Sequence, residues 1–210
     1  LTEKFTVEAI DFIRSNKTKP FFLYLPYSAP HFPLESHPNW EGKSNFGVYG
    51  DVVEEMDARI GEILNTLKKE GLEKKTLVIF CSDNGPEPLT KESLAKPFRG
   101  KKWSSLEGGT SVPCILIWPG VLSAGREIDE LISAMDLLPT LADVCRIDLT
   151  KHSSDHLPRA VTAKLEECVD TVGRFRRPAA PARNSRVIVP VRWGRIVASR
   201  RTVAEAATIE

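Results

Sequence analysis

Two neighbouring residues of this chain, Asp83 and Asn84, could together hold a hard metal ion. They stand in Ser-Asp-Asn-Gly, directly after the apolar run at residues 76–81. Asp83 offers a carboxylate and Asn84 an amide carbonyl, and both are oxygen ligands of the kind that a hard divalent cation takes. Taken alone, Asp-Asn-Gly is also a common turn sequence, so the metal interpretation depends on the surrounding segments.

A histidine in a restricted loop is the next candidate. His31 stands in Pro-His-Phe-Pro, between Pro30 and Pro33. The two prolines stiffen the loop and lower the entropy cost of holding the imidazole in place. The alternative is an ordinary surface histidine, and His37 follows shortly after as a competing choice.

A basic cluster at Arg99–Lys102 precedes Glu107-Gly108-Gly109. A lysine ammonium is a compact charge with three donors, which suits contact with an anion. Lys102 and Lys101 both qualify by residue type, and the cluster could also be a solvated loop. The two glycines would permit a tight turn after it.

Helices and strands must position these side chains. Apolar residues at spacings of three and four predict helices, and short apolar runs predict strands. The predicted elements are helices at 2–14, 48–70 and 136–144 and strands at 21–25, 76–81 and 112–118. Gly71 should end the second helix, and Asp136 should cap the third, with Pro139 in its first turn.

The alternation of strands and helices predicts an α/β fold with a partial, mostly parallel sheet flanked by helices. Ligands of such sheets bind beyond the carboxyl ends of the strands. His31 and Asp83 each follow a predicted strand at that end. We therefore expect the two residues to meet at one edge of the sheet.

Composition excludes several classes of protein. Apolar residues make up 41% and charged residues 27% of the chain, which is typical of a globular domain and includes no run long enough to span a membrane. The cysteines form no C-x-x-C pair, so a zinc site is not expected. Cys81, Cys114 and Cys145 lie in apolar segments and are expected to be buried, while Cys168 lies further along.

A change of composition near residue 150 marks a boundary. Residues 1–150 have a net charge of −5 and residues 151–210 a net charge of +6, with ten arginines in the second segment. We expect residues 150–210 to form an irregular Arg/Ala-rich tail, disordered or produced by a reading-frame shift, and sensitive to proteases. Only residues 187–191 have a strand pattern. A basic tail can bind nucleic acid, but neither interleaved aromatic residues nor a recognised nucleic-acid motif supports a specific site here.

Four segments, taken in order, resemble the sulfatase family. They are Pro20–Tyr24 leading to Pro30–Pro33, Thr76–Gly85, Arg99–Gly109 and Asp136–Leu141. The resemblance covers residues 1–149 and implies the C-terminal part of an arylsulfatase A-like catalytic domain of the alkaline phosphatase superfamily. One departure is Ser111, where the family usually has arginine.

The resemblance implies a sulfuric ester hydrolase that cleaves sulfate monoesters at a calcium-assisted site. Asp83 and Asn84 would be calcium ligands, while His31 and Lys102 would bind the sulfate group and assist catalysis. His37 and Lys101 fit the family's motifs less well. The substrate would be a sulfate ester of a small molecule or a sulfated glycan.

The family's nucleophile is a formylglycine made in a C-x-P-S-R or S-x-P-S-R motif. The 210 residues contain neither motif, nor the family's Asp-Asp pair of calcium ligands. We expect both upstream of Leu1, together with any signal peptide, and we expect little turnover by this chain alone. By analogy with exported bacterial sulfatases, the location would be periplasmic or secreted.

Phosphatases and phosphodiesterases of the same superfamily are the alternative enzymes. They use more His and Asp ligands, for two transition metals, and this chain has four His. A non-catalytic fragment whose basic tail binds nucleic acid is the third interpretation.

Overall fold

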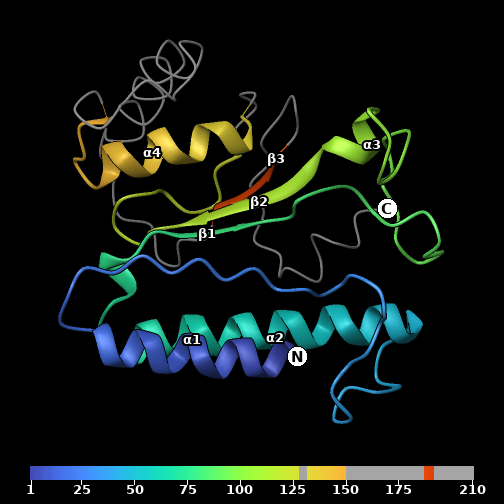
Figure 1. Ribbon diagram of the computed structural model, residues 1–210, viewed down its shortest axis with the longest axis horizontal. Helices are drawn as coiled ribbons and strands as arrows, with labels where there is room; N and C mark the ends of the chain where they lie inside the picture. Colours follow the sequence, from blue (N-terminus) through green and yellow to red (C-terminus); the bar gives the residue numbers. More distant parts are fainter. Residues whose placement is uncertain (128–131, 150–186, 192–210) are drawn as a thin grey trace.

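The computed structural model describes residues 1–127, 132–149 and 187–191 of the chain (Figure 1). The helices are α1 (Thr2–Asn16), α2 (Gly47–Lys69), the four-residue α3 (Glu107–Thr110) and α4 (Leu137–Val144), and the strands are β1 (Val78–Cys81), β2 (Val112–Ile117) and β3 (Val187–Val191). Two short 3-10 helices, Glu73–Lys75 and Ala134–Asp136, complete the elements.

The two long helices form one side of the molecule and match the sequence predictions closely. Ala9 and Ile13 of α1 are buried, as are Met56 and Leu67 of α2, because the apolar stripe of each helix faces the interior. Figure 1 shows α1 lying along α2. The predicted end of α2 is confirmed, since Gly71 has a φ of +70°, a conformation that favours glycine.

The predicted strand at 21–25 is extended but is not a strand of the sheet. Side chains alternate along it, with Phe21 and Leu23 packed against the core formed by Ile13, Leu67 and Leu72. Phe22 and Tyr24 point the other way and are 72% and 76% exposed. The alternation expected of a strand is therefore present, while among the described residues no sheet ladder includes this run.

The three described strands are antiparallel, in the order β1-β2-β3, which corrects the expected mostly parallel orientation. A parallel pair needs a crossover that returns the chain to the opposite end of the sheet. The connection from β1 to β2 contains only α3 and short turns, so β2 starts where β1 ends. The α/β class stands, since the helix pair and α4 lie at different levels on either side of β1 and β2 in Figure 1.

The remaining predictions have mixed outcomes. The predicted strand at 187–191 is confirmed as β3, and the rest of the predicted tail over 150–210 lies outside the described residues. Helix α4 ends at Val144 as expected. The Asp136 carboxylate does not cap it, because Asp136 Oδ2 instead accepts the backbone N–H of Ser133 at 2.6 Å.

The cysteine prediction is correct for one residue of three. Cys114 is buried, whereas Cys81 and Cys145 are exposed. All three are free thiols. Within the part of the chain that the structure describes, no helix has the length and apolar character needed to cross a membrane.

Candidate functional site

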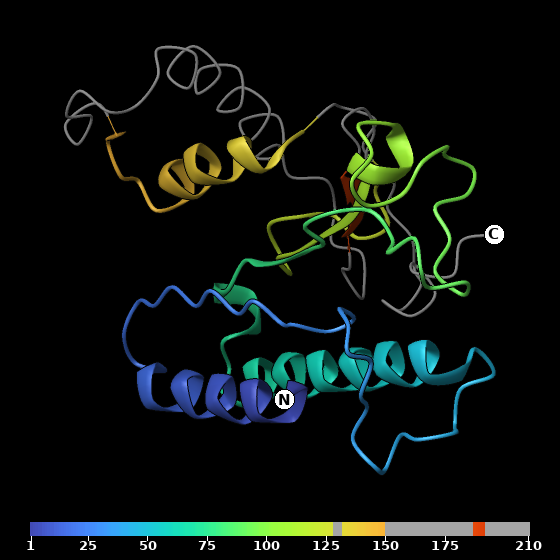
Figure 2. The same ribbon diagram turned by 45° about the vertical axis from the view of Figure 1, so that its right-hand side comes forward.

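Backbone hydrogen bonds join the Asp83-Asn84 turn to the loop that carries Lys102. The Gly85 N–H donates to the carbonyl of Gly109 at 2.9 Å, and the Lys102 N–H donates to the carbonyl of Pro86 at 2.9 Å. The turn follows β1 directly, and the lysine loop leads through α3 into β2. Two segments that sequence analysis singled out separately are thus held against each other at the end of β1 (Figure 2).

Three glycines allow this close approach. A Cβ placed on Gly85 would lie 1.9 Å from the carbonyl oxygen of Gly108, and a Cβ on Gly109 would lie 2.2 Å from the carbonyl oxygen of Ser104. A Cβ on Gly108 would lie 2.2 Å from the carbonyl oxygen of Gly100. The prediction of a tight turn is therefore refined, because Gly108 and Gly109 are needed for contact between backbones and lie inside α3.

The two adjacent lysines have different environments. The Lys101 ammonium donates to the backbone carbonyls of Thr90 and Ser93, at 3.3 and 3.1 Å, and so ties its own loop together. The Lys102 ammonium lies 3.8 Å from Glu87 Oε2 and 5.7 Å from the ring centroid of Trp103. Among the described residues, no backbone carbonyl accepts a hydrogen bond from the Lys102 ammonium, which leaves ammonium protons for an anion and favours Lys102 over Lys101.

Glu87 is a residue that sequence analysis missed. Its side chain is 16% exposed, and its Oε1 atom is buried with no hydrogen-bond partner among the described residues. A buried carboxylate oxygen without a donor is costly, so Glu87 depends on the nearby Lys102 charge. The sequence offered one indication of Glu87, its position four residues after Asp83, and that spacing does not by itself predict a site residue.

Asp83 and Asn84 present the oxygen ligands expected for calcium in part. Asp83 is exposed. Asn84 Nδ2 donates to the carbonyl of Gly85 at 3.0 Å, so its Oδ1 is directed away from that bond. Calcium takes six to eight oxygens, and in the described ranges no cluster of three or more His, Cys, Asp or Glu could hold a metal. The two residues fit calcium in donor type, and water or another segment would have to complete its shell.

His31 lies in an exposed loop beyond the extended run at 20–28. Its Nδ1 is 2.8 Å from the carbonyl oxygen of Phe32, and its backbone N–H donates to Ser28. These contacts are all within its own loop, and none joins it to Asp83 or Lys102. The structure therefore brings together three of the four predicted site residues and leaves His31 unconnected to them.

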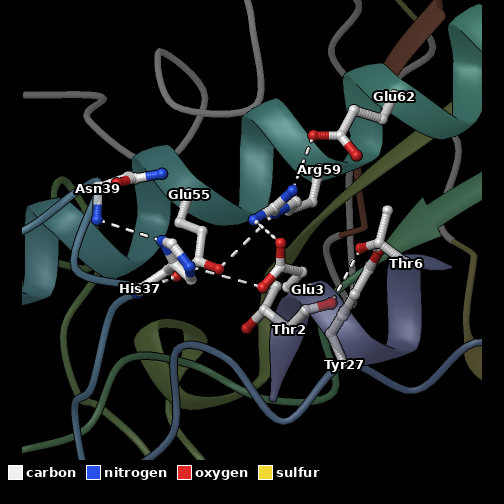
Figure 3. A network of polar contacts seen from close by, with 9 residues as sticks. All are labelled: Thr2, Glu3, Thr6, Tyr27, His37, Asn39, Glu55, Arg59 and Glu62. Atoms are coloured by element: carbon white, nitrogen blue, oxygen red, sulfur yellow. Dashed lines mark hydrogen bonds and ion pairs between the residues drawn. The ribbon is translucent and has the colours of Figure 1, made fainter.

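His37, the competing histidine, is part of a structural network (Figure 3). Its Nδ1 accepts the Asn39 N–H at 3.2 Å, and its Nε2 lies 3.6 Å from Glu3 of α1. Its backbone N–H donates to Glu55, which is 3% exposed, at 2.7 Å. Both ring nitrogens are occupied by the protein itself, so His31 is the better candidate for ligand contact.

Two acidic residues of α2 fix the loop that follows His31. Glu55 holds the start of the loop through His37. Asp51, one turn earlier and 3% exposed, accepts the backbone N–H groups of Gly42, Lys43 and Ser44 at 2.8 to 3.1 Å. These hydrogen bonds hold the pKa of Asp51 below its usual range.

Comparison with known proteins places this arrangement in context. The family model described as Sulfatase matches residues 1–147. Steryl-sulfatase of Homo sapiens is 44% identical over 149 residues, which cover 68% of this chain and 26% of that protein. N-acetylgalactosamine-6-O-sulfatase of Bacteroides thetaiotaomicron is 36% identical over 167 residues, covering 72% of this chain and 32% of that protein.

Solved structures agree with these matches. The crystal structure of Ps i-CgsB superposes with a TM-score of 0.64 and 35% sequence identity, covering 72% of this chain and 36% of that chain. The same protein in complex with k-i-k-neocarrahexaose gives a TM-score of 0.63. The chain thus spans about a quarter to a third of the length of the relatives described here.

Proposed function

Because the chain belongs to the sulfatase family, we propose that it provides part of the active site of a sulfuric ester hydrolase that cleaves sulfate monoesters. The observation that carries the proposal is the pair of backbone hydrogen bonds holding the Lys102 loop against the Asp83-Asn84 turn. This contact supports the proposal because it holds the segment that carries Lys102 against the segment that carries Asp83 and Asn84, after the end of β1. A sulfate ester needs both a cation and metal ligands, since its negative charge is spread over several oxygens.

Within this proposal, Lys102 contacts the sulfate oxygens and the leaving oxygen through its ammonium, and Glu87 positions it. His31 contacts the sulfate group from the second loop and protonates the leaving oxygen. Asp83 and Asn84 bind calcium, which when bound would neutralise charge on the sulfate oxygens. A formylglycine nucleophile would have to come from outside these 210 residues, since they contain no C-x-P-S-R or S-x-P-S-R motif.

A flat organic group next to the sulfate fits the surface beside Lys102. Trp103 is 81% exposed and has its ring 5.7 Å from the Lys102 ammonium. An exposed indole offers an apolar face on which an aromatic or sugar ring can stack. This supports an aryl sulfate or a sulfated glycan as the substrate, rather than a short alkyl sulfate.

Binding tests the proposal without requiring turnover. We expect 4-nitrophenyl sulfate to bind the 210-residue chain saturably and to shift the amide NMR signals of residues 83–85 and 101–103. The Lys102→Met variant should bind at least about tenfold more weakly, because a hydrogen bond to a charged group contributes about 1.5–3 kcal/mol. Lys91→Met, at an exposed position, is the control and should keep its affinity.

4-Nitrophenol, which lacks the sulfate, should cause none of these shifts. Saturable binding that maps elsewhere, or that survives Lys102→Met unchanged, would show that the site is wrongly assigned. We also expect no release of 4-nitrophenol by the purified chain, and rapid hydrolysis would contradict the assignment of the nucleophile to another segment.

A further inference from the structure

Two cysteines face each other across the β1-β2 pair. Cys81 of β1 and Cys114 of β2 are direct partners in the antiparallel register. Directly opposed residues of an antiparallel pair place their side chains on the same face of the sheet. Both are free thiols, with Cys81 exposed and Cys114 only 1% exposed.

The hydrogen-bond pattern decides how close the two residues are. The Ser82 N–H donates to the carbonyl of Pro113 at 3.2 Å, so the next pair along the register is the hydrogen-bonded one. Cys81 and Cys114 therefore occupy a non-hydrogen-bonded position, where Cα atoms are about 4.5 Å apart and side chains approach most closely. A disulfide requires Cα atoms about 4.4–6.8 Å apart, so this position is compatible with one.

We propose that Cys81 and Cys114 are a site of reversible oxidation, closing a cross-strand disulfide when the chain meets a small-molecule disulfide such as oxidised glutathione. The exposed Cys81 sulfur attacks one sulfur of glutathione disulfide, forming a mixed disulfide and releasing one glutathione, which takes the Cys81 proton. The Cys114 sulfur then attacks the Cys81 sulfur and releases the second glutathione. Two protein thiols are oxidised, and one glutathione disulfide is reduced to two thiols.

The environments of the two sulfurs set this order of steps. Burial raises the pKa of both thiols, that of Cys114 to about 12, so access rather than acidity decides the order. Cys114 is 1% exposed and is poorly reached by reagents from solution, whereas Cys81 is exposed. The reaction of Cys114 with a mixed disulfide on the facing strand is intramolecular and benefits from a high local concentration. Cys81 is therefore the point of entry.

The bond would lie at the end of β1, next to Ser82 and the Asp83-Asn84 turn. It would fix the end of β1 to the start of β2, and it would form whether or not the chain takes part in sulfate ester hydrolysis. We expect thiol reductants to open the bond again, because thiol–disulfide exchange is reversible.

The experiment is a peptide map of the native full chain after incubation with oxidised glutathione, acid quenching and alkylation. We expect the tryptic peptides 76–91 and 103–126 to appear as one linked species, lighter than the sum of the two thiol peptides by two hydrogen atoms. Cys145 and Cys168 should be recovered in peptides that are not linked to either of these two, as alkylated thiols or as glutathione adducts. The same treatment in concentrated urea is the control for unspecific pairing and should give several linked species.

Variants give the second test. Cys114→Ala should stop at a glutathione adduct on Cys81, and Cys81→Ala should remain unmodified at Cys114, while Cys145→Ala should form the link as the unchanged chain does. The link should disappear with dithiothreitol, and the oxidised chain should unfold at a higher temperature. A persistent glutathione adduct on Cys81 in the unchanged native chain, or a link from Cys81 to Cys145, would overturn the proposal, and neither result depends on a variant folding.

Discussion

Single carboxylates at buried positions organise the loop that follows His31. Asp51 accepts the backbone N–H groups of Gly42, Lys43 and Ser44, and of these the Lys43 N–H also donates to the carbonyl of Trp40 at 3.3 Å. A carboxylate is a better acceptor for several donors than a neutral group. The same interactions that order the loop therefore stabilise the charged form of Asp51 and lower its pKa.

This residue gives the fold a dependence on acid. Because the pKa of Asp51 is lowered on folding, its contribution is present above its ordinary value of about 4 and is lost as the pH falls through the lowered value. We expect Asp51→Asn to melt several degrees below the unchanged chain at pH 7. The difference should shrink steadily in strong acid when thermal unfolding is followed by circular dichroism.

Asp11, which lies on the exposed face of α1 and pairs with Arg14 at 3.9 Å, provides the control. Asp11→Asn should change the melting temperature little at either pH. Equal melting of Asp51→Asn and the unchanged chain at neutral pH would mean that the three loop hydrogen bonds do not stabilise the fold.

The position of the Lys102 ammonium is expected to depend on Glu87, whose Oε2 lies 3.8 Å away. We expect Glu87→Gln to keep the fold but to leave the Lys102 ammonium without its partially buried counter-charge, so that the lysine is less well positioned. Affinity for 4-nitrophenyl sulfate, measured by titration, should fall severalfold, and Glu87→Asp should recover less than full affinity because its side chain is shorter. Unchanged affinity in Glu87→Gln would remove the positioning role.

At the level of elements, close backbone contacts at glycines hold the two loops of the candidate site together. We expect Gly85→Ala to destabilise the chain by about 1–3 kcal/mol or more, the usual cost of forcing atoms into a filled space. The Cβ would meet a backbone carbonyl at 1.9 Å, which cannot move like a side chain. Denaturant unfolding would measure the change.

Gly61, in the middle of α2, is the matched control because a Cβ there would meet nothing within 4 Å. Gly61→Ala should stabilise by roughly 0.5–1 kcal/mol through helix propensity. If both alanine variants had the same stability change, the close approach at Gly85 would have no energetic importance.

The elements also show what sequence patterns can and cannot predict. Periodicity predicted α1 and α2 within a few residues, and Gly71 predicted where α2 ends, because these features are local. Strand direction and pairing depend on where a connection leads the chain. Because the residues between β1 and β2 form no crossover helix, β2 runs antiparallel to β1. The expected parallel orientation was therefore wrong for the described strands.

The roles of the candidate site residues stay predictions. Resemblance to the sulfatase family selected Lys102, and the contacts of the two lysines differ, since Lys101 donates to two backbone carbonyls and Lys102 lies near Glu87. Glu87 could not be found from sequence, since its role depends on two loops touching. The two loops touch through backbone groups of Gly85, Pro86 and Gly109. Because backbone hydrogen-bonding groups are common to nearly all residue types, the side-chain sequence does not reveal such a contact.

At the level of the whole molecule, the proposed site would supply only part of a metal shell. As proposed calcium ligands, Asp83 and Asn84 would provide two oxygen atoms, well below the six to eight that calcium takes. We expect calcium to bind the 210 residues with a dissociation constant on the order of millimolar or weaker, measured by isothermal titration. Asp83→Asn should weaken it further, and micromolar binding would mean that additional ligands lie within this chain.

The extended run at 20–28 has a practical consequence for anyone who purifies the protein. On one side of the run, Phe21 and Leu23 pack against the core, while Phe22 and Tyr24 on the other side are exposed to solvent. Extended backbone with exposed aromatic side chains attracts similar segments from neighbouring molecules. In concentrated samples, aggregation should therefore begin at residues 20–28. Replacing both Phe22 and Tyr24 by lysine should lower the turbidity of such samples.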